Sequence, residues 1–250
     1  MTVILSRPFQ SFHIDSLSKR WAAVLLLLFA WGVSFWFLFA PPGDPDFSQL
    51  MYWYEDLMEA EDYMAYYSAH PFENVFTSAN LLYLLSMGVY FSVMYLIGLF
   101  YFVLHVCDLR QVSVSKAPGI YFTRIWWLVL YSASVLVPAL ILFSVFPFAF
   151  MVMIPAFYAR PGLVMFDKKD AYTATMLSSV KTRGHKLSIF VELSIISLLY
   201  TILHVIVYNV LNSGSIGFCL VESFLRGYFA LVLARNMSMR FHMITVFHEE

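Results

Sequence analysis

Charged residues are scarce in this sequence of 250 residues: Asp, Glu, Lys and Arg together make up 12% of it. A soluble domain carries about 25% of these residues. Hydrophobic residues make up 61%, and a soluble domain of this length could not bury so many, since it still exposes a large surface. A lipid-facing surface resolves the excess, so we expect an all-α, polytopic membrane helix bundle forming one transmembrane domain over residues 1–250.

Cysteine is almost absent. The two cysteines, Cys107 and Cys219, give neither a disulfide framework nor a metal-ligand spacing. The topology described below places them near opposite membrane faces, so we expect free thiols. No metal or other cofactor is expected.

Linear catalytic motifs are also missing. The sequence contains no His-Glu-x-x-His, no Gly-rich phosphate loop, no Gly-x-Ser-x-Gly and no Cys-x-x-Cys. This argues against an enzyme and predicts no catalytic residues, although intramembrane enzymes can lack linear motifs. A nucleic-acid partner is not expected, because the basic residues follow the membrane boundaries and form no excess patch.

Long apolar runs are what the sequence does have. A span needs about 20 residues, so the 34 uncharged residues of 125–158 predict a helical hairpin continuing toward residue 166. The alternative is one tilted, Pro-kinked helix. The first apolar run, residues 21–40, is longer than the 7–15 apolar residues of a signal peptide and is followed by Pro41 and Pro42. We therefore interpret it as a membrane span that is retained. About six spans follow: 21–40, 75–104, two within 125–166, 187–211 and 218–234.

The basic residues are distributed unevenly along this map. Fourteen of the fifteen lie in segments that the six spans place on one side, and the fifteenth, Arg226, lies inside the last span. The positive-inside rule then places both termini in the cytoplasm, in a plasma membrane.

Residues 43–74 form an acidic, extracytoplasmic segment with eight carboxylates and no Lys or Arg. Apolar residues at helical spacing predict one amphipathic helix over about 47–69. Two interpretations stay open: the helix rests on the membrane domain by its aromatic face, or it docks a partner. The residues proposed for docking are Trp53, Tyr54, Glu55, Glu59 and Asp62, and those expected on the protected face are Trp53, Tyr54, Leu57 and Met64.

Residues 160–186 form a basic cytoplasmic joint between two sets of spans. Asp167 could cap a helix over about 168–182, with Gly184 just past its end. The joint is interpreted either as an interfacial helix held by snorkelling cations or as a site for a cytoplasmic partner or anionic lipid head groups. The head-group candidates are Lys181, Arg183, His185 and Lys186.

A short pattern begins in this joint and consists of Ser178 or Ser179, the triplet Gly184, His185 and Lys186, then Phe190 and the run Leu193, Ser194, Ile195 and Ile196. This pattern resembles an uncharacterised bacterial membrane family catalogued as domain of unknown function 975. The N-terminal Lys19, Arg20 and Trp21 are also similar to that family, whereas 44–124 match it weakly. The resemblance implies a bacterial multi-helix membrane protein and supplies no activity.

Four ionisable residues fall within predicted spans: Glu192, His204, Glu222 and Arg226. Such residues are costly in hydrocarbon and usually face a bundle interior or a water-filled path. Glu222 and Arg226 are four apart on one helix and should pair, and Glu192 is a second partner to consider for Arg226. The cluster either locks the last two spans together or lines a proton or solute path.

Three functions follow from these features. The first is a non-enzymatic membrane subunit that binds or positions another membrane or extracytoplasmic protein, or a second copy of itself, in the bilayer. The second is a small-solute, ion or peptide transporter or channel component that uses the polar residues of the last two helices. The third is an intramembrane enzyme acting on lipid.

The topology can be tested with reporter fusions. Fusions at residues 65 and 215 should report outside, and fusions at 115, 175 and 250 should report inside, because the basic segments stay in the cytoplasm. An outside signal at 175 would contradict the hairpin.

Overall fold

The computed structural model describes residues 10–12, 17–129 and 157–246, and all regular elements in this part of the chain are helices. Four of these helices are long and apolar enough to cross a membrane, which suits a multi-pass membrane protein. They are α2 (Leu17–Phe39), α5 (Ser78–Leu109), α10 (Lys186–Val210) and α11 (Ile216–Val246).

The predicted hairpin falls mainly on residues 130–156, outside the described residues. Residues 117–129 are helical, after a short 3-10 turn, η2 (Val114–Lys116). The second arm is not one continuous helix to residue 166, because Tyr158 and Ala159 form a turn. A separate short helix, α8 (Arg160–Met165), follows with Pro161 in its first turn, where a missing N–H costs little.

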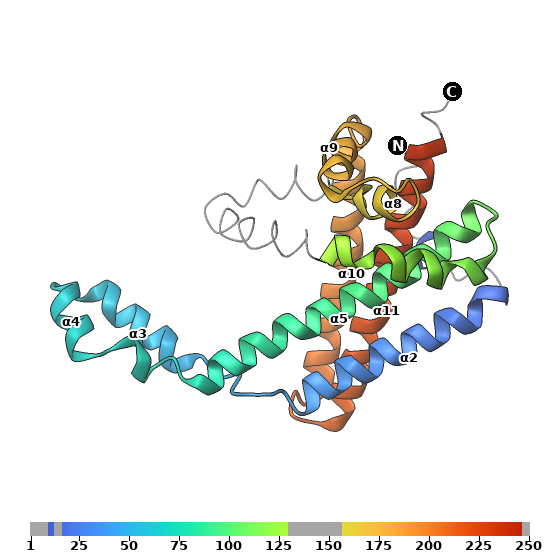
Figure 1. Cartoon of the computed structure of the whole chain (residues 1–250). Helices are drawn as coiled ribbons and strands as arrows, with labels where there is room; N and C mark the ends of the chain where they lie inside the picture. The colour runs from blue at the N-terminus through green and yellow to red at the C-terminus, as the bar shows by residue number, and fades with distance from the viewer. Residues whose placement is uncertain (1–9, 13–16, 130–156, 247–250) are drawn as a thin grey trace.

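Helix α11 is the centre of the bundle: it packs against α2, α5 and α10. Figure 1 shows α2 and α5 running together and crossing α10 and α11. The turn between α10 and α11 is tight, with the Ser215 N–H donating to the Asn212 carbonyl at 2.9 Å. This turn lies between the spans 187–211 and 218–234 that the sequence predicts.

Small residues bring α11 close to its neighbours. A Cβ added at Gly227 would lie 3.2 Å from the Trp31 backbone N and 3.3 Å from the Ala30 Cβ. On α5, a Cβ at Gly98 would lie 3.7 Å from the Ala230 carbonyl oxygen. Between lipid-embedded helices there is no hydrophobic driving force, so such close backbone packing supplies much of the association energy.

Helix α11 is longer than the sequence predicts. A sixth span over 218–234 ends near Arg235, but the helix continues to Val246. The extension remains helical because it is packed: Phe241 has no exposed surface, and its ring occupies the space that a side chain at Gly162 of α8 would need. Residues 235–246 are therefore part of the bundle and not a tail.

The predicted single helix over 47–69 is wrong. The segment forms two helices, α3 (Ser48–Glu59) and α4 (Tyr63–Ala69), followed by a 3-10 turn, η1 (Phe72–Asn74). Ala60 is extended at ψ 133°, and the Asp62 carboxylate caps α4 by accepting from the Met64 and Ala65 N–H groups at 3.0 Å. The extended backbone at Ala60 thus ends α3, and Asp62 serves as the N-cap that starts α4.

The pair α3–α4 does not rest on the membrane bundle. Figure 1 shows it at the far end of α5, away from α10 and α11. Trp53 is partly buried within the pair, where its ring meets Tyr66, Tyr67 and Phe72 and its Nε1–H donates to the His70 carbonyl at 2.8 Å. Leu57 is also partly buried, but Tyr54 and Met64, expected on the protected face, are 55% and 81% exposed.

The joint contains α9 (Ala171–Lys181), whose N-cap is Asp170 and not the predicted Asp167. The helix cannot begin at Lys168, because that residue has a left-handed φ of 53°. Hydrogen bonds from Thr173 lower the pKa of Asp170, which keeps its carboxylate charged as a cap. Asp167 instead lies 3.7 Å from Arg110 at the end of α5. Gly184, at φ 85°, follows the helix as predicted.

The contact between α2 and α11 gives a stability test. We expect Gly227→Leu to lower the free energy of unfolding by about 1–3 kcal/mol, because the new side chain must separate two backbones. Thermal melting of the detergent-solubilised protein measures the change. Gly32→Leu on α2 is the matched control, since a Cβ there meets nothing within 4 Å. Equal melting of the two variants would contradict the close packing.

Candidate functional site

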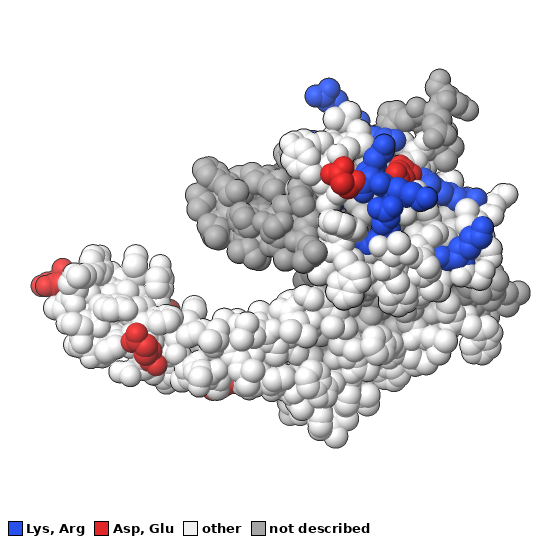
Figure 2. All heavy atoms as spheres, viewed as in Figure 1, with Lys and Arg blue, Asp and Glu red and all other residues white. Residues whose placement is uncertain are grey.

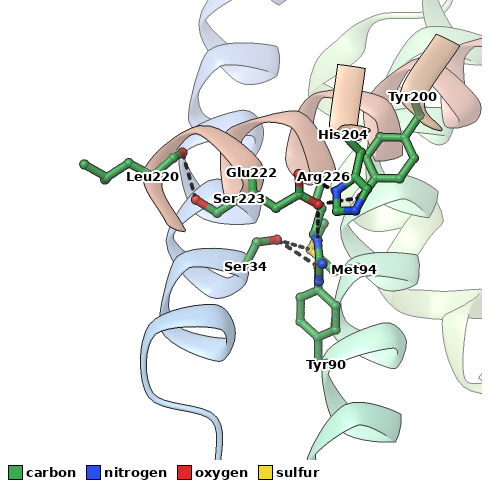
Figure 3. A network of polar contacts seen from close by, with 9 residues as sticks. All are labelled: Ser34, Tyr90, Met94, Tyr200, His204, Leu220, Glu222, Ser223 and Arg226. Atoms are coloured by element: carbon green, nitrogen blue, oxygen red, sulfur yellow. Dashed lines mark hydrogen bonds and ion pairs between the residues drawn. The ribbon is translucent and has the colours of Figure 1, made fainter. Parts of the chain in front are cut away.

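The four intramembrane residues predicted as one cluster belong to two separate networks. In the first, Glu222 has no exposed surface and its carboxylate is the centre. Its Oε1 accepts hydrogen bonds from Arg226 Nε at 2.9 Å and from the Tyr200 hydroxyl at 2.8 Å. His204 Nδ1 lies 3.0 Å from the other oxygen, Oε2, in a contact that lacks good hydrogen-bond geometry. Figure 3 shows these side chains converging on the carboxylate.

Helical spacing explains how this network forms. Glu222 and Arg226 are four apart on α11, and Tyr200 and His204 are four apart on α10, so each pair shares one helix face. The Glu222–Arg226 pairing confirms the sequence prediction. On the other side of Arg226, the Ser34 hydroxyl of α2 lies 3.1 Å from the Tyr90 hydroxyl of α5 (Figure 3). Polar contacts around Glu222 and Arg226 therefore involve side chains from all four long helices.

The second network surrounds Glu192, which also has no exposed surface. Arg240 donates to both carboxylate oxygens, at 2.7 Å from Nε to Oε2, and Asn236 Nδ2 donates to Oε2 at 3.1 Å. The Tyr158 hydroxyl donates to Asn236 Oδ1 at 2.5 Å. The expectation that Glu192 might serve Arg226 is thus wrong: its partner is Arg240.

Sequence reasoning missed Arg240 because it placed that residue beyond the last predicted span, 218–234. A signal was present: Arg240 follows Glu222 by 18 residues, which is about five turns at 3.6 residues per turn. The two therefore lie on the same face of one helix if that helix continues, and that face packs against α10. Residues 235–246 contain neither Gly nor Pro, so no helix-breaking residue prevents this continuation.

A cavity of about 190 Å³ lies beside the second network. Its wall combines polar side chains with methionines, and His242 Nδ1 is buried there without a hydrogen-bond partner among the described residues. Since Glu192 and Arg240 neutralise each other, the cavity presents little net charge. The lining residues are Gln10, Leu109, Glu192, Asn236, Met239, Arg240, His242 and Met243.

The predicted docking residues have divided roles. Glu55 and Glu59 are exposed on α3, and Tyr54 points outward beside them. Trp53 instead holds α3 against α4, and Asp62 caps α4, so these two shape the pair. None of the residues in α3 and α4 is buried. Large exposed apolar side chains on the pair are Met51, Tyr52, Tyr54, Met58, Tyr63, Met64 and Tyr67.

The predicted head-group residues lie together at the opposite end of the molecule. Lys181 is in the last turn of α9, Arg183 and His185 are exposed, and Lys186 begins α10. Figure 2 shows Lys and Arg gathered around this end, whereas the α3–α4 end carries Asp and Glu. The charge separation along the chain is therefore also a separation in space.

Metal chemistry finds no support in the described residues, where no group of three or more His, Cys, Asp or Glu could hold an ion. Cys107 and Cys219 are buried free thiols, as predicted. They lie near opposite ends of the bundle, since Cys107 is near the end of α5 and Cys219 is near the start of α11.

No family model, curated protein or solved structure matches the chain. The resemblance to domain of unknown function 975 therefore stays a prediction.

The two ion pairs should differ in their effect on stability. We expect Arg240→Ala to cost about 3–5 kcal/mol, because it leaves Glu192 buried without a counter-charge. Arg226→Ala should cost less, since the Arg226 side chain is 28% exposed against 3% for Arg240, and Glu222 keeps Tyr200 and His204. Thermal melting in detergent compares the variants.

Double variants serve as controls. Arg240→Ala combined with Glu192→Gln should melt closer to the unaltered protein than Arg240→Ala does, because no unpaired charge remains. The same ordering is expected for Arg226→Ala with and without Glu222→Ala. If single and double variants melt alike, the uncompensated carboxylate is not the cause of the lost stability, and the ion-pair interpretation is contradicted.

Proposed function

We propose that this chain is a non-enzymatic, integral membrane subunit that uses α3–α4 to bind a basic, partly apolar extracytoplasmic protein. The observation that carries the proposal is that α3 and α4 bury none of their residues and expose large apolar side chains among carboxylates. Aromatic and methionine side chains supply much of the binding energy in protein interfaces.

The charge pattern sets the orientation of the proposed subunit. The positive-inside rule favours a cytoplasmic location for the basic end and for both termini, in the plasma membrane. The α3–α4 pair then faces the outside, where its carboxylates would attract cations on a partner and raise the rate of association.

The same pattern disfavours a second copy as the partner at this surface. Among the described residues, the Lys and Arg side chains visible in Figure 2 gather at the end opposite α3–α4. Two copies inserted in the same orientation would therefore bring acidic surfaces together, and like charges repel.

A transporter component is the second candidate function, and one observation favours it. The His204 side chain of α10 is 35% exposed and lies 3.0 Å from the fully buried Glu222 of α11, so two ionisable side chains meet inside the candidate spans. Ionisable residues at such depth can relay protons. Each buried carboxylate is paired with an arginine, Glu222 with Arg226 and Glu192 with Arg240. This pairing supports a structural role instead, because it stabilises the ionised carboxylate.

Photo-crosslinking in native membranes tests the docking proposal. A photoreactive residue at Tyr52 should give an adduct with a basic outer protein, because that side chain is 62% exposed beside the carboxylates. Tyr172, also 62% exposed but at the opposite end, is the matched control and should not give that adduct. Adduct masses identify the bound molecule.

Charge reversal then tests the contribution of the carboxylates. Glu55→Lys with Glu59→Lys should weaken the complex by about tenfold or more, because like charges would meet across the interface. Glu73→Lys, an exposed change in η1, should have little effect. Asp62 is left intact because it caps α4. An adduct with lipid alone or with a second copy, or equal yields in both variants, would contradict the proposal.

A further inference from the structure

Helix α9 presents an apolar stripe that the described part of the chain leaves uncovered. Tyr172, Met176 and Val180 recur every four residues and are 62%, 53% and 64% exposed. This spacing places them on one helix face. The opposite face is packed against the protein, and the Ser178 hydroxyl there accepts a hydrogen bond from the Ala159 N–H at 3.1 Å. The buried residues of α9 are Ala171, Ala174 and Ser178.

The stripe ends close to the start of a candidate membrane span. Helix α9 ends at Lys181, and α10 begins at Lys186. Leu187, in the first turn of α10, is 71% exposed. The C-terminal end of α9 is therefore at the membrane boundary, and its apolar side chains are within reach of lipid.

Cations without a carboxylate partner lie at the C-terminal end of this stripe. Lys181, Arg183 and Lys186 have no carboxylate partner among the described residues, and they are exposed or partly exposed. Two other cations at the same end are neutralised: Arg110 lies 3.7 Å from Asp167, and Arg240 is paired with Glu192. The α9–α10 junction thus combines an apolar strip with excess positive charge.

We propose that α9 is an interfacial helix that binds anionic phospholipid. Its apolar stripe would lie at the boundary between head groups and acyl chains, and Lys181, Arg183 and Lys186 would contact lipid phosphates. Helices with one apolar face and flanking cations bind anionic membranes in this way. A soluble phosphate would neutralise the cations but leave the apolar stripe in water, so the lipid is the better fit. This surface is independent of any partner at α3–α4.

The proposal predicts that α9 lies deeper in an anionic membrane. An environment-sensitive fluorophore on Met176→Cys should be quenched by spin-labelled lipid more strongly in nanodiscs of mixed phosphatidylcholine and phosphatidylglycerol than in phosphatidylcholine alone. Cys107 and Cys219 are buried, which limits competing labelling. A fluorophore on Ser115→Cys, exposed in η2 after α5, is the control and should show little quenching in either lipid.

Neutralising the cations should reverse the effect. Replacing Lys181, Arg183 and Lys186 by Gln should weaken phosphatidylglycerol retention, measured by native mass spectrometry, by about fivefold for each cation removed. Lys116→Gln, an exposed cation outside α9, should change it much less. High salt should weaken retention by the unaltered chain too, which tests the charges even if the triple variant does not fold.

Three outcomes would overturn the proposal. Equal quenching in the two lipid mixtures would mean that charge does not hold α9 at the surface. Absence of quenching in both would mean that protein covers the stripe. Displacement of phosphatidylglycerol by inorganic phosphate alone would mean that the cations form a soluble-anion site.

Discussion

Two carboxylates without any exposed surface constrain this structure more than any other feature. Glu192 on α10 and Glu222 on α11 each require a cation and hydrogen-bond donors, because an unpaired buried charge costs several kcal/mol. Their partners come from both helices: Arg240 on α11 pairs with Glu192, while Tyr200 and His204 on α10 meet Glu222. The antiparallel pair is thereby held in one register at two separate levels.

The length of α11 follows from this constraint. Arg240 reaches Glu192 only if the helix continues well past Arg235, and the same extension carries Phe241 against α8 at Gly162. Nearer the start of α11, Gly227 lets this helix approach the backbone of α2. Helix α11 therefore pairs with the charge of α10, packs closely on α2 and contacts α8 in the joint at the basic end.

Two exposed apolar surfaces lie outside the packed bundle. Both α3–α4 and one face of α9 expose large apolar side chains, but their surroundings carry opposite charge. An acidic aromatic surface suits a basic protein, whereas an apolar stripe flanked by cations suits an anionic lipid surface. Under the two proposals made above, the membrane would separate two binding surfaces with different chemistry, and the polar networks between them would serve as structural ties.

The sequence by itself determined the all-helical membrane class, the approximate positions of the four described candidate spans apart from the C-terminal end of α11, the segregation of acidic from basic segments and the Glu222–Arg226 pair. These depend on composition, run length and spacing along one helix, all of which are local. The break at Ala60 was not determined, because the apolar spacing continues through it and Asp62 becomes a cap only when the backbone turns. Asp167 and Asp170 could each cap α9, and the left-handed backbone at Lys168 selects Asp170. The partner of Glu192 was decided only by tertiary structure, because no local rule says which of several arginines a carboxylate on another helix will meet.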